Sequence, residues 1–177
     1  MVSLIDWSPD EDFPVFPQGS RPKKTVIAPT VGLPDFLVPG HRYIFKYSVG
    51  RHPVQFWSEV IAYELGKLVG VVVPPAFVAI DGDGKPGALI EFFYGHPGSG
   101  TNLRYVHAKD YLTRLIPGFD EKKGREHNLM TNMRLCLFFE GKGALRGSII
   151  FWAKTLVFDA LIGNTDRHQE NWGFLWP

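Results

Sequence analysis

An apolar segment, Ser148 to Gly163, stands near the end of this chain and runs directly into a polar stretch, Asn164 to Asn171. Its length suits a helix, and the glycine at its end predicts that the helix stops there. The longer apolar run from Gly143 to Gly163 is interrupted by Arg146, Lys154 and Asp159, so it predicts a buried core helix and no membrane span. The chain is therefore expected to hold a helical core here, with a polar loop leaving its end.

The polar loop places an aspartate and an asparagine five residues apart, at Asp166 and Asn171. The catalytic loop of protein kinases has the same spacing: its Asp accepts the proton of the attacking hydroxyl, and its Asn holds a magnesium ion. The short separation lets one loop direct both groups at the same phosphate. We therefore take Asp166 as the candidate catalytic base and Asn171 as the candidate metal ligand. His168 lies between them and joins the candidate catalytic residues, and we expect it to orient the loop by hydrogen bonding.

A lysine in an apolar strand and a glutamate in the next helix form a second pattern. The run Tyr43 to Tyr47 follows a Pro-Gly turn and predicts a strand that contains Lys46. The periodicity from about Pro53 to Leu68 predicts a helix that contains Glu59. Phosphoryl transfer needs a cation on the nucleotide phosphates and a partner that holds this cation in place. A lysine in a strand more commonly faces water. We nevertheless favour phosphate binding by Lys46, because the Asp166 loop occurs in the same chain as Lys46 and Glu59.

A basic turn that contains a glycine, Gly19 to Lys24, precedes the first predicted strand. It is neither a GxGxxG loop nor a Walker A loop, yet Gly19 permits close backbone approach to a phosphate and Lys23 supplies charge. A solvated turn is the alternative, and the local sequence favours it. A phosphate on Ser20 would pair with Arg21 and Lys23 and draw the turn away from a nucleotide. We keep Gly19, Ser20 and Lys23 as candidate nucleotide-binding residues.

The two halves of the chain differ in their predicted elements. Strands with one helix dominate the first half and helices dominate the second, so we expect an α+β fold with two lobes, residues 1–94 and 95–177. Glycines around Pro97 predict the hinge between these lobes. The further predicted elements are strands at 24–28, 76–80 and 88–93, a hairpin turn at 81–84, and helices at 109–116 and 128–139.

Composition limits the classes of function. The 177 residues carry a formal net charge of +1, so no bulk electrostatic argument favours binding to nucleic acid or to a membrane. The single Cys136 excludes an internal disulfide and a multi-cysteine metal cage. The six histidines form no HxH or HExxH pattern, so no zinc site is expected. The chain does not begin with a basic region and an apolar run, so we expect a cytoplasmic protein without a secretory signal.

Together these patterns resemble the HipA family of bacterial serine/threonine kinases, the toxin kinases of toxin–antitoxin operons. The resemblance is to the compact form without the extra N-terminal domain, and it implies a bilobal protein-kinase-like fold that uses ATP and Mg2+. The final loop is the specific motif, and the other matches are weak one by one. The matching stretches are residues 19–23, Phe45-Lys46, Ser58-Glu59, Val73 to Ala76, and Asn164 to Asn171.

The resemblance also implies roles and partners. For the final loop, the resemblance implies the roles already inferred from the spacing, with Asp166 as the catalytic base and Asn171 as the metal ligand. It also implies that Lys46 contacts the ATP phosphates while Glu59 orients Lys46. Glu91, Phe92 and Phe93 fall where the linker that contacts adenine should lie. The implied substrate is a protein hydroxyl, for instance on an aminoacyl-tRNA synthetase. An antitoxin or a complementing chain is an expected partner, and neither nucleic acid nor a membrane is.

The chain departs from the family after the final loop. Family members continue into a second metal-binding Asp and several more helices, whereas this sequence has no Asp after Asp166 and ends at Pro177. We therefore expect a fragment, a natural truncation, or a protein whose remainder another chain supplies, with an incomplete helical C-lobe. Two alternatives stay open. The final loop also resembles that of phosphoinositide 3/4-kinases, which share the fold, and a chain without the second Asp can be a non-catalytic module that binds a nucleotide or a partner.

Overall fold

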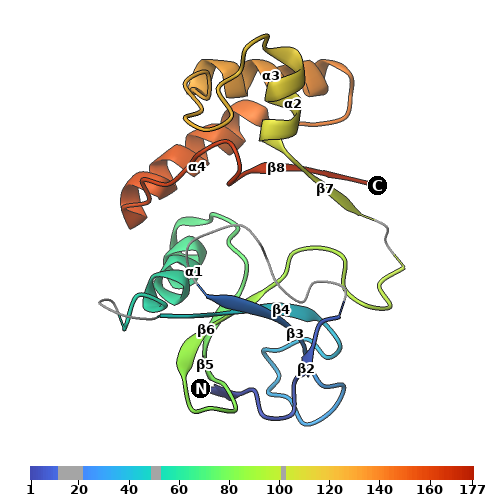
Figure 1. Ribbon diagram of the computed structural model, residues 1–177, viewed down its shortest axis with the longest axis vertical. Coiled ribbons are helices and arrows are strands. Elements are labelled where there is room, and N and C mark those ends of the chain that lie inside the picture. Colours follow the sequence, from blue (N-terminus) through green and yellow to red (C-terminus); the bar gives the residue numbers. More distant parts are fainter. Residues whose placement is uncertain (12–21, 49–52, 101–102) are drawn as a thin grey trace. The chain divides into compact units, whose positions relative to one another are not determined.

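The computed structural model describes residues 1–11, 22–48, 53–100 and 103–177. The chain divides into two compact units, Met1–Asn102 and Leu103–Pro177, each of which is described by itself (Figure 1). A β-sheet with one helix dominates the described part of the first unit, and helices dominate the second. The division into two kinase lobes, residues 1–94 and 95–177, stays a prediction.

A six-stranded sheet forms the described part of the first unit, in the order β1-β5-β6-β4-β3-β2. Strand β1 runs parallel to β5, and the other neighbours are antiparallel. The two shortest strands lie at the edges of the sheet, and both belong to the first nine residues of the chain. The strands span Val2–Ser3 (β1), Ser8–Pro9 (β2), Lys23–Ile27 (β3), Arg42–Tyr47 (β4), Ala76–Ile80 (β5) and Pro86–Glu91 (β6).

One face of the central strands carries the hydrophobic core of the first unit. Tyr43 and Phe45 of β4 and Leu89 of β6 are fully buried there. Because successive side chains of a strand point to opposite faces, Lys46 lies on the other face. Gly87 of β6 allows the close packing: an added Cβ would lie 2.5 Å from the Lys46 carbonyl oxygen and 2.6 Å from the Phe45 ring. The aromatic core thus decides to which face the lysine points.

Helix α1, Trp57–Val69, packs against β5 and β6. The residues from Pro53 to Phe56 form turns, so the helix begins later than its periodicity predicted. Gly70 ends the helix in the left-handed conformation, with φ of 67°, which confirms the predicted stop. Glu59 falls in the first turn, where the helix dipole favours a negative charge.

The second unit packs three helices and a two-stranded ribbon around one core over its described residues. Helix α4 ends at Gly163, whose φ of 67° is left-handed, as the sequence predicted. The loop that follows leads into β8, so both ends of this loop attach to core elements. The elements are β7 (Arg104–His107), α2 (Ala108–Leu115), α3 (Leu129–Gly141), α4 (Ser148–Ile162) and β8 (Gly173–Trp176), with β7 and β8 antiparallel. The buried core includes Leu112, Leu135, Cys136, Trp152, Trp172 and Phe174.

The expected α+β class is confirmed, with one sheet of six strands, one of two strands and four helices over the described residues. The ribbon of β7 and β8 was not predicted. Each of its strands has only four residues, and each finds its partner more than sixty residues away in the sequence. Among the helices of the described ranges, none has the length and apolar character that a membrane span needs.

Candidate functional site

Lys46 and Glu59 form an ion pair, with the lysine Nζ 3.0 Å from the glutamate Oε1. Strand β4 supplies the lysine, and the first turn of α1 supplies the glutamate. Both side chains are 28% exposed, so the pair is partly shielded from water and still open to a ligand. The sequence predicted that these two residues act together, and the fold brings them into direct contact.

Lys23 of β3 lies directly opposite Lys46 in the antiparallel β3–β4 pair. Opposite residues of such a pair point to the same face of the sheet, so two ammonium groups share the face that meets Glu59. Burial and the Lys46 charge lower the pKa of Lys23, and Glu59 partly offsets this effect. These three described residues together carry a net positive charge, which suits a polyanion such as a chain of phosphates.

The basic turn predicted at residues 19–24 lies only partly within the described residues. Lys23 and Lys24 belong to β3, because the pairing with β4 extends as far as Lys23 and Lys46. Lys23 therefore reaches the candidate site from a strand and not from a turn. Gly19 and Ser20 lie outside the described residues, and so does the predicted phosphorylation of Ser20.

Glu91, Phe92 and Phe93 end strand β6 and begin the chain that follows it. Glu91 pairs with Tyr43, and its Oε2 accepts a hydrogen bond of 3.4 Å from the tyrosine hydroxyl. Burial, together with the Glu91 charge, raises the pKa of Tyr43 to about 12. The Glu91 side chain thus lies on the face opposite to Lys46, so only its backbone can meet a ligand there. Phe92 is buried and Phe93 is 54% exposed; their role as an adenine-contacting linker stays a prediction.

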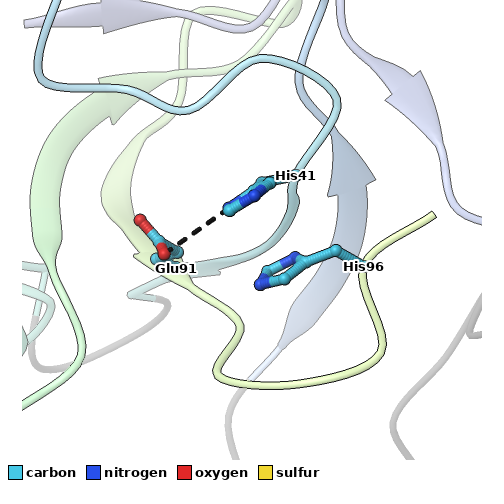
Figure 2. A group of neighbouring side chains, drawn as sticks. All are labelled: His41, Glu91 and His96. Carbon is cyan, nitrogen blue, oxygen red and sulfur yellow. Dashed lines mark ion pairs between the residues drawn. The ribbon is translucent and has the colours of Figure 1, made fainter. Parts of the chain in front are cut away.

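His41, Glu91 and His96 form a cluster beside the end of β6 (Figure 2). Their potential metal-ligand atoms all lie within 4.8 Å of one another, and His41 Nδ1 is 3.6 Å from Glu91 Oε1. The two imidazole rings are stacked, however, with centroids 3.8 Å apart and planes inclined by 13°. A metal ion lies close to the plane of each imidazole that binds it, and two stacked planes do not share such a position. His96 Nδ1 also accepts a hydrogen bond of 3.0 Å from the Arg42 backbone N–H, which places the proton of the neutral ring on Nε2. The stacked rings therefore do not suit a metal ion shared by all three residues, although the buried His41 Nδ1 makes no hydrogen bond to the described residues.

Arg42, the first residue of β4, holds together segments that are distant in the sequence. Its buried guanidinium pairs with the buried Asp10 through Nε and through Nη2, the latter 3.2 Å from Oδ1. Its Nη1 donates to the Gly95 carbonyl, and its own carbonyl accepts the N–H of Phe92. One side chain thus fastens both the N-terminal segment and the chain after β6 to the sheet. No local pattern marks such an arginine, and the sequence analysis did not identify it.

Asp166, His168 and Asn171 lie on the loop between α4 and β8. The Asp166 carboxylate is 81% exposed and lies 3.7 Å from His168 Nε2. The Glu170 N–H donates to His168 Nδ1 at 3.2 Å, which turns the other ring nitrogen toward Asp166. The Asn171 side-chain amide donates to the Asp166 carbonyl, and the Asn171 N–H donates to the His168 carbonyl. The loop therefore closes on itself, with the Asp166 carboxylate in solvent, and Asn171 Oδ1 accepts no hydrogen bond from the residues that the structure describes.

Asp159, in the last turn of α4, anchors the first half of this loop. Its buried carboxylate accepts hydrogen bonds of 2.8 and 2.7 Å from Arg167 and one of 2.8 Å from the Asn164 amide. Burial alone would raise the pKa of Asp159, but these hydrogen bonds hold the pKa below its ordinary value of 3.8. The Asn164 Oδ1 in turn accepts the Asp166 N–H at 3.2 Å. The sequence analysis assigned Asp159 only to the helix and missed this anchoring role.

Comparisons with known proteins bear on the fold. No protein-family model matches the sequence, and a search of curated proteins finds no match. The structure is similar to the crystal structure of the Helicobacter pylori proinflammatory kinase CtkA, with a TM-score of 0.65 and 19% sequence identity. The similarity covers 98% of this chain and 54% of that chain, so this chain spans about half the length of the solved structure. The chain thus has a kinase-like fold, as expected, whereas membership of the HipA family stays a prediction.

Proposed function

We propose that this protein is a phosphotransferase of the kinase type, which binds ATP and magnesium and transfers the γ-phosphate to a hydroxyl. The observation that carries the proposal is the 3.0 Å ion pair between Lys46 on a strand and Glu59 on the following helix. Kinases use such a pair to hold the lysine on the nucleotide phosphates. The kinase-like fold supports the same conclusion, because it offers the context in which the pair has this role.

The charged residues of the first unit suit a triphosphate. Lys46 is restrained by Glu59, and Lys23 adds a second ammonium group on the same face. Two neighbouring cations repel each other, so an anion bound at both relieves this repulsion. We therefore assign the phosphates to Lys46 and Lys23, with Glu59 as the residue that positions Lys46.

The loop of the second unit suits a magnesium ion and a proton acceptor. Carboxylate and amide oxygens are the ligands that magnesium prefers, and the loop offers the Oδ1 of Asn171, whose amide nitrogen donates to the Asp166 backbone carbonyl. When bound, the magnesium ion neutralises charge on the phosphoryl group. Asp166 accepts the proton of the attacking hydroxyl, and His168, 3.7 Å away, orients its carboxylate.

The resemblance to the HipA family supports a finer version of this proposal. In that version the acceptor is a protein serine or threonine, the protein is the toxin component of a toxin–antitoxin system, and it acts in the cytoplasm. An aminoacyl-tRNA synthetase is the proposed substrate, and an antitoxin or a complementing chain is the proposed partner. These statements rest on the resemblance of the motifs, and the catalytic chemistry above does not depend on them.

Calorimetric titration of the 177-residue chain with MgATP, combined with transfer of radiolabelled γ-phosphate, tests the proposal. We expect Lys46→Met to weaken MgATP binding at least about tenfold, because a charged contact to phosphate is lost. Asp166→Asn should keep the affinity within about threefold and lower transfer at least about 100-fold, because it removes the proton acceptor. Lys85→Met is the matched control: Lys85 is an exposed lysine beside Asp83, at 3.8 Å, and its loss should change neither quantity.

Each alternative has its own outcome in this experiment. Transfer to phosphoinositides, with no transfer to protein substrates, would replace the protein kinase by a lipid kinase. Binding of MgATP without transfer to either substrate would indicate a nucleotide-binding module. The proposal is overturned if MgATP does not bind, or if Lys46→Met binds it as well as the wild type.

A further inference from the structure

The loop that carries Asp166 and Asn171 is braced along its second half by residues Asp120–His127, which we name the bracing segment. The buried Gln169 donates its amide N–H to the Glu121 carbonyl at 3.0 Å. The Lys109 ammonium links the loop to the same segment, 2.8 Å from Glu170 Oε1 and 3.5 Å from Glu121 Oε2. The bracing segment thus holds the part of the loop that leads to the candidate metal ligand.

Trp172, which directly follows Asn171, is held in one orientation. It is 7% exposed, and its ring packs edge-to-face on Trp152 at 4.8 Å and on Phe174 at 5.6 Å between centroids. Its carbonyl accepts the Ala108 N–H at 3.0 Å. The indole N–H is its only side-chain polar group, and it donates to His127 Nε2 at 2.9 Å. Because Asn171 is joined to Trp172 by a peptide bond, the same contacts restrict Asn171.

His127 is placed to act as a hydrogen-bond acceptor. Its Nε2 faces the Trp172 indole N–H and also lies 3.0 Å from the Asn132 side-chain nitrogen, so the neutral ring carries its proton on Nδ1. The His127 backbone N–H donates to Gly124 within the bracing segment at 2.9 Å. Burial, together with the charge of His168, lowers the pKa of His127 and so favours this neutral form. Loss of the ring would leave the buried indole N–H without its acceptor, which is costly.

We infer that His127 is a positioning residue for the metal-binding end of the loop. By accepting the Trp172 indole proton at Nε2, it fixes Trp172 and, through the adjoining peptide, the placement of Asn171. The metal part of this inference rests on the proposed function. The hydrogen bond between His127 and Trp172 and its effect on the loop do not depend on that function, because they follow from the geometry of the second unit alone.

Substitution of His127 tests the inference, with the hydrogen exchange of the metal-free protein as the first readout. In His127→Leu we expect the Trp172 indole N–H and the Asn171 backbone N–H, which donates to the His168 carbonyl at 3.0 Å, to exchange at least about tenfold faster, because these hydrogen bonds open more often. His127→Gln should restore exchange to within about threefold of the wild type, because the Gln Oε1 reaches the position of Nε2 and accepts the same proton.

The second readout is the magnesium concentration that gives half-maximal binding of a non-hydrolysable ATP analogue. We expect a rise of about tenfold in His127→Leu, the size typical when a residue that orients a metal ligand is lost, and again rescue by His127→Gln. Trp172→Phe removes only the indole N–H and should reproduce the effect; it decides the test if His127→Leu fails to fold. Trp176→Phe is the matched control, because it removes another indole hydrogen bond of β8, the 2.7 Å contact with Tyr111.

The outcomes separate this inference from the proposed function. Unchanged exchange in a folded His127→Leu or Trp172→Phe protein overturns the positioning role. Equal effects of Trp176→Phe overturn it as well, because they would show a general response of the core. If the analogue does not bind the wild type, the proposed function fails, while the exchange measurements still decide the role of His127 in holding the loop.

Discussion

Lys23 and Lys46 face each other across β3 and β4, so two like charges occupy directly opposed positions of one sheet face. Like charges in this arrangement destabilise a sheet, and the pair is therefore better suited to ligand binding than to stability. We expect Lys23→Gln to raise the free energy of unfolding by about 0.2–1 kcal/mol, because the repulsion is removed. The same variant should weaken MgATP binding about tenfold, because a charged contact is lost. Urea unfolding and calorimetry measure the two effects.

Lys24→Gln is the control for Lys23→Gln, in which stability is expected to rise while MgATP affinity falls. Lys24 is the next residue of β3 and points to the other face, where it lies 3.4 Å from Asp81 and over the Phe45 ring. Its replacement should lower the free energy of unfolding by up to about 1 kcal/mol and leave nucleotide affinity unchanged. Equal loss of affinity in both variants would show that only the overall charge of the first unit matters.

Removal of one partner of the buried Arg42–Asp10 pair should destabilise the first unit strongly. Arg42→Met leaves the Asp10 carboxylate buried without its guanidinium, and it also removes the bond to Gly95. The expected loss is about 3–5 kcal/mol in the free energy of unfolding, measured by urea denaturation. The double variant Arg42→Met/Asp10→Leu should lose less than Arg42→Met alone. A single variant as stable as the wild type would contradict the assigned role of Arg42.

The anchor at Asp159 predicts a dependence of stability on pH. Because the fold lowers the pKa of Asp159, its stabilising effect is fully present above the ordinary value of 3.8 and is lost as the pH falls through the lower value of the folded protein. Asp159→Asn should therefore lower the free energy of unfolding by about 1.5–3 kcal/mol at neutral pH, with the difference shrinking in acid. Chemical denaturation at a series of pH values measures this difference.

Asp110→Asn is the control for this pH series, because Asp110 is exposed and lies in the first turn of α2. Its replacement should cost no more than about 0.3–1 kcal/mol, from the interaction with the helix dipole. A constant difference between Asp159→Asn and the wild type at every pH would contradict the lowered pKa.

The single cysteine should be unreactive in the folded protein. Cys136 is 3% exposed, its Sγ accepts the Trp152 indole N–H at 3.3 Å, and burial raises the pKa of its thiol. A thiol reagent should modify Cys136 at least about 100-fold more slowly in the folded protein than in urea, because the buried thiol reacts only when the core around it opens. Each tenfold reduction in rate corresponds to about 1.4 kcal/mol of free energy of opening. Equal rates in the two conditions would show that the core around Cys136 opens easily.

The sequence analysis succeeded where the signal is local and failed where it is not. Helix α4 and its stop at Gly163 follow from apolar composition and a helix-ending glycine, and the strand around Lys46 follows from an apolar run after a turn. The His127–Trp172 hydrogen bond joins residues 45 positions apart, and no short pattern marks either residue as the other's partner. The same holds for the pair of Arg42 and Asp10, which the spacing of neighbouring residues does not reveal.

By itself, then, the sequence determined the α+β class, the contact between Lys46 and Glu59, and the spacing of Asp166 and Asn171. Periodicity, turn residues and short spacings carry this information, because they act through neighbouring residues. Only the tertiary structure decided that Lys23 joins Lys46 on one face while the Glu91 side chain points to the other. The reason is strand register: a shift of one residue would turn each side chain to the opposite face, and pairing and packing across the sheet select the register.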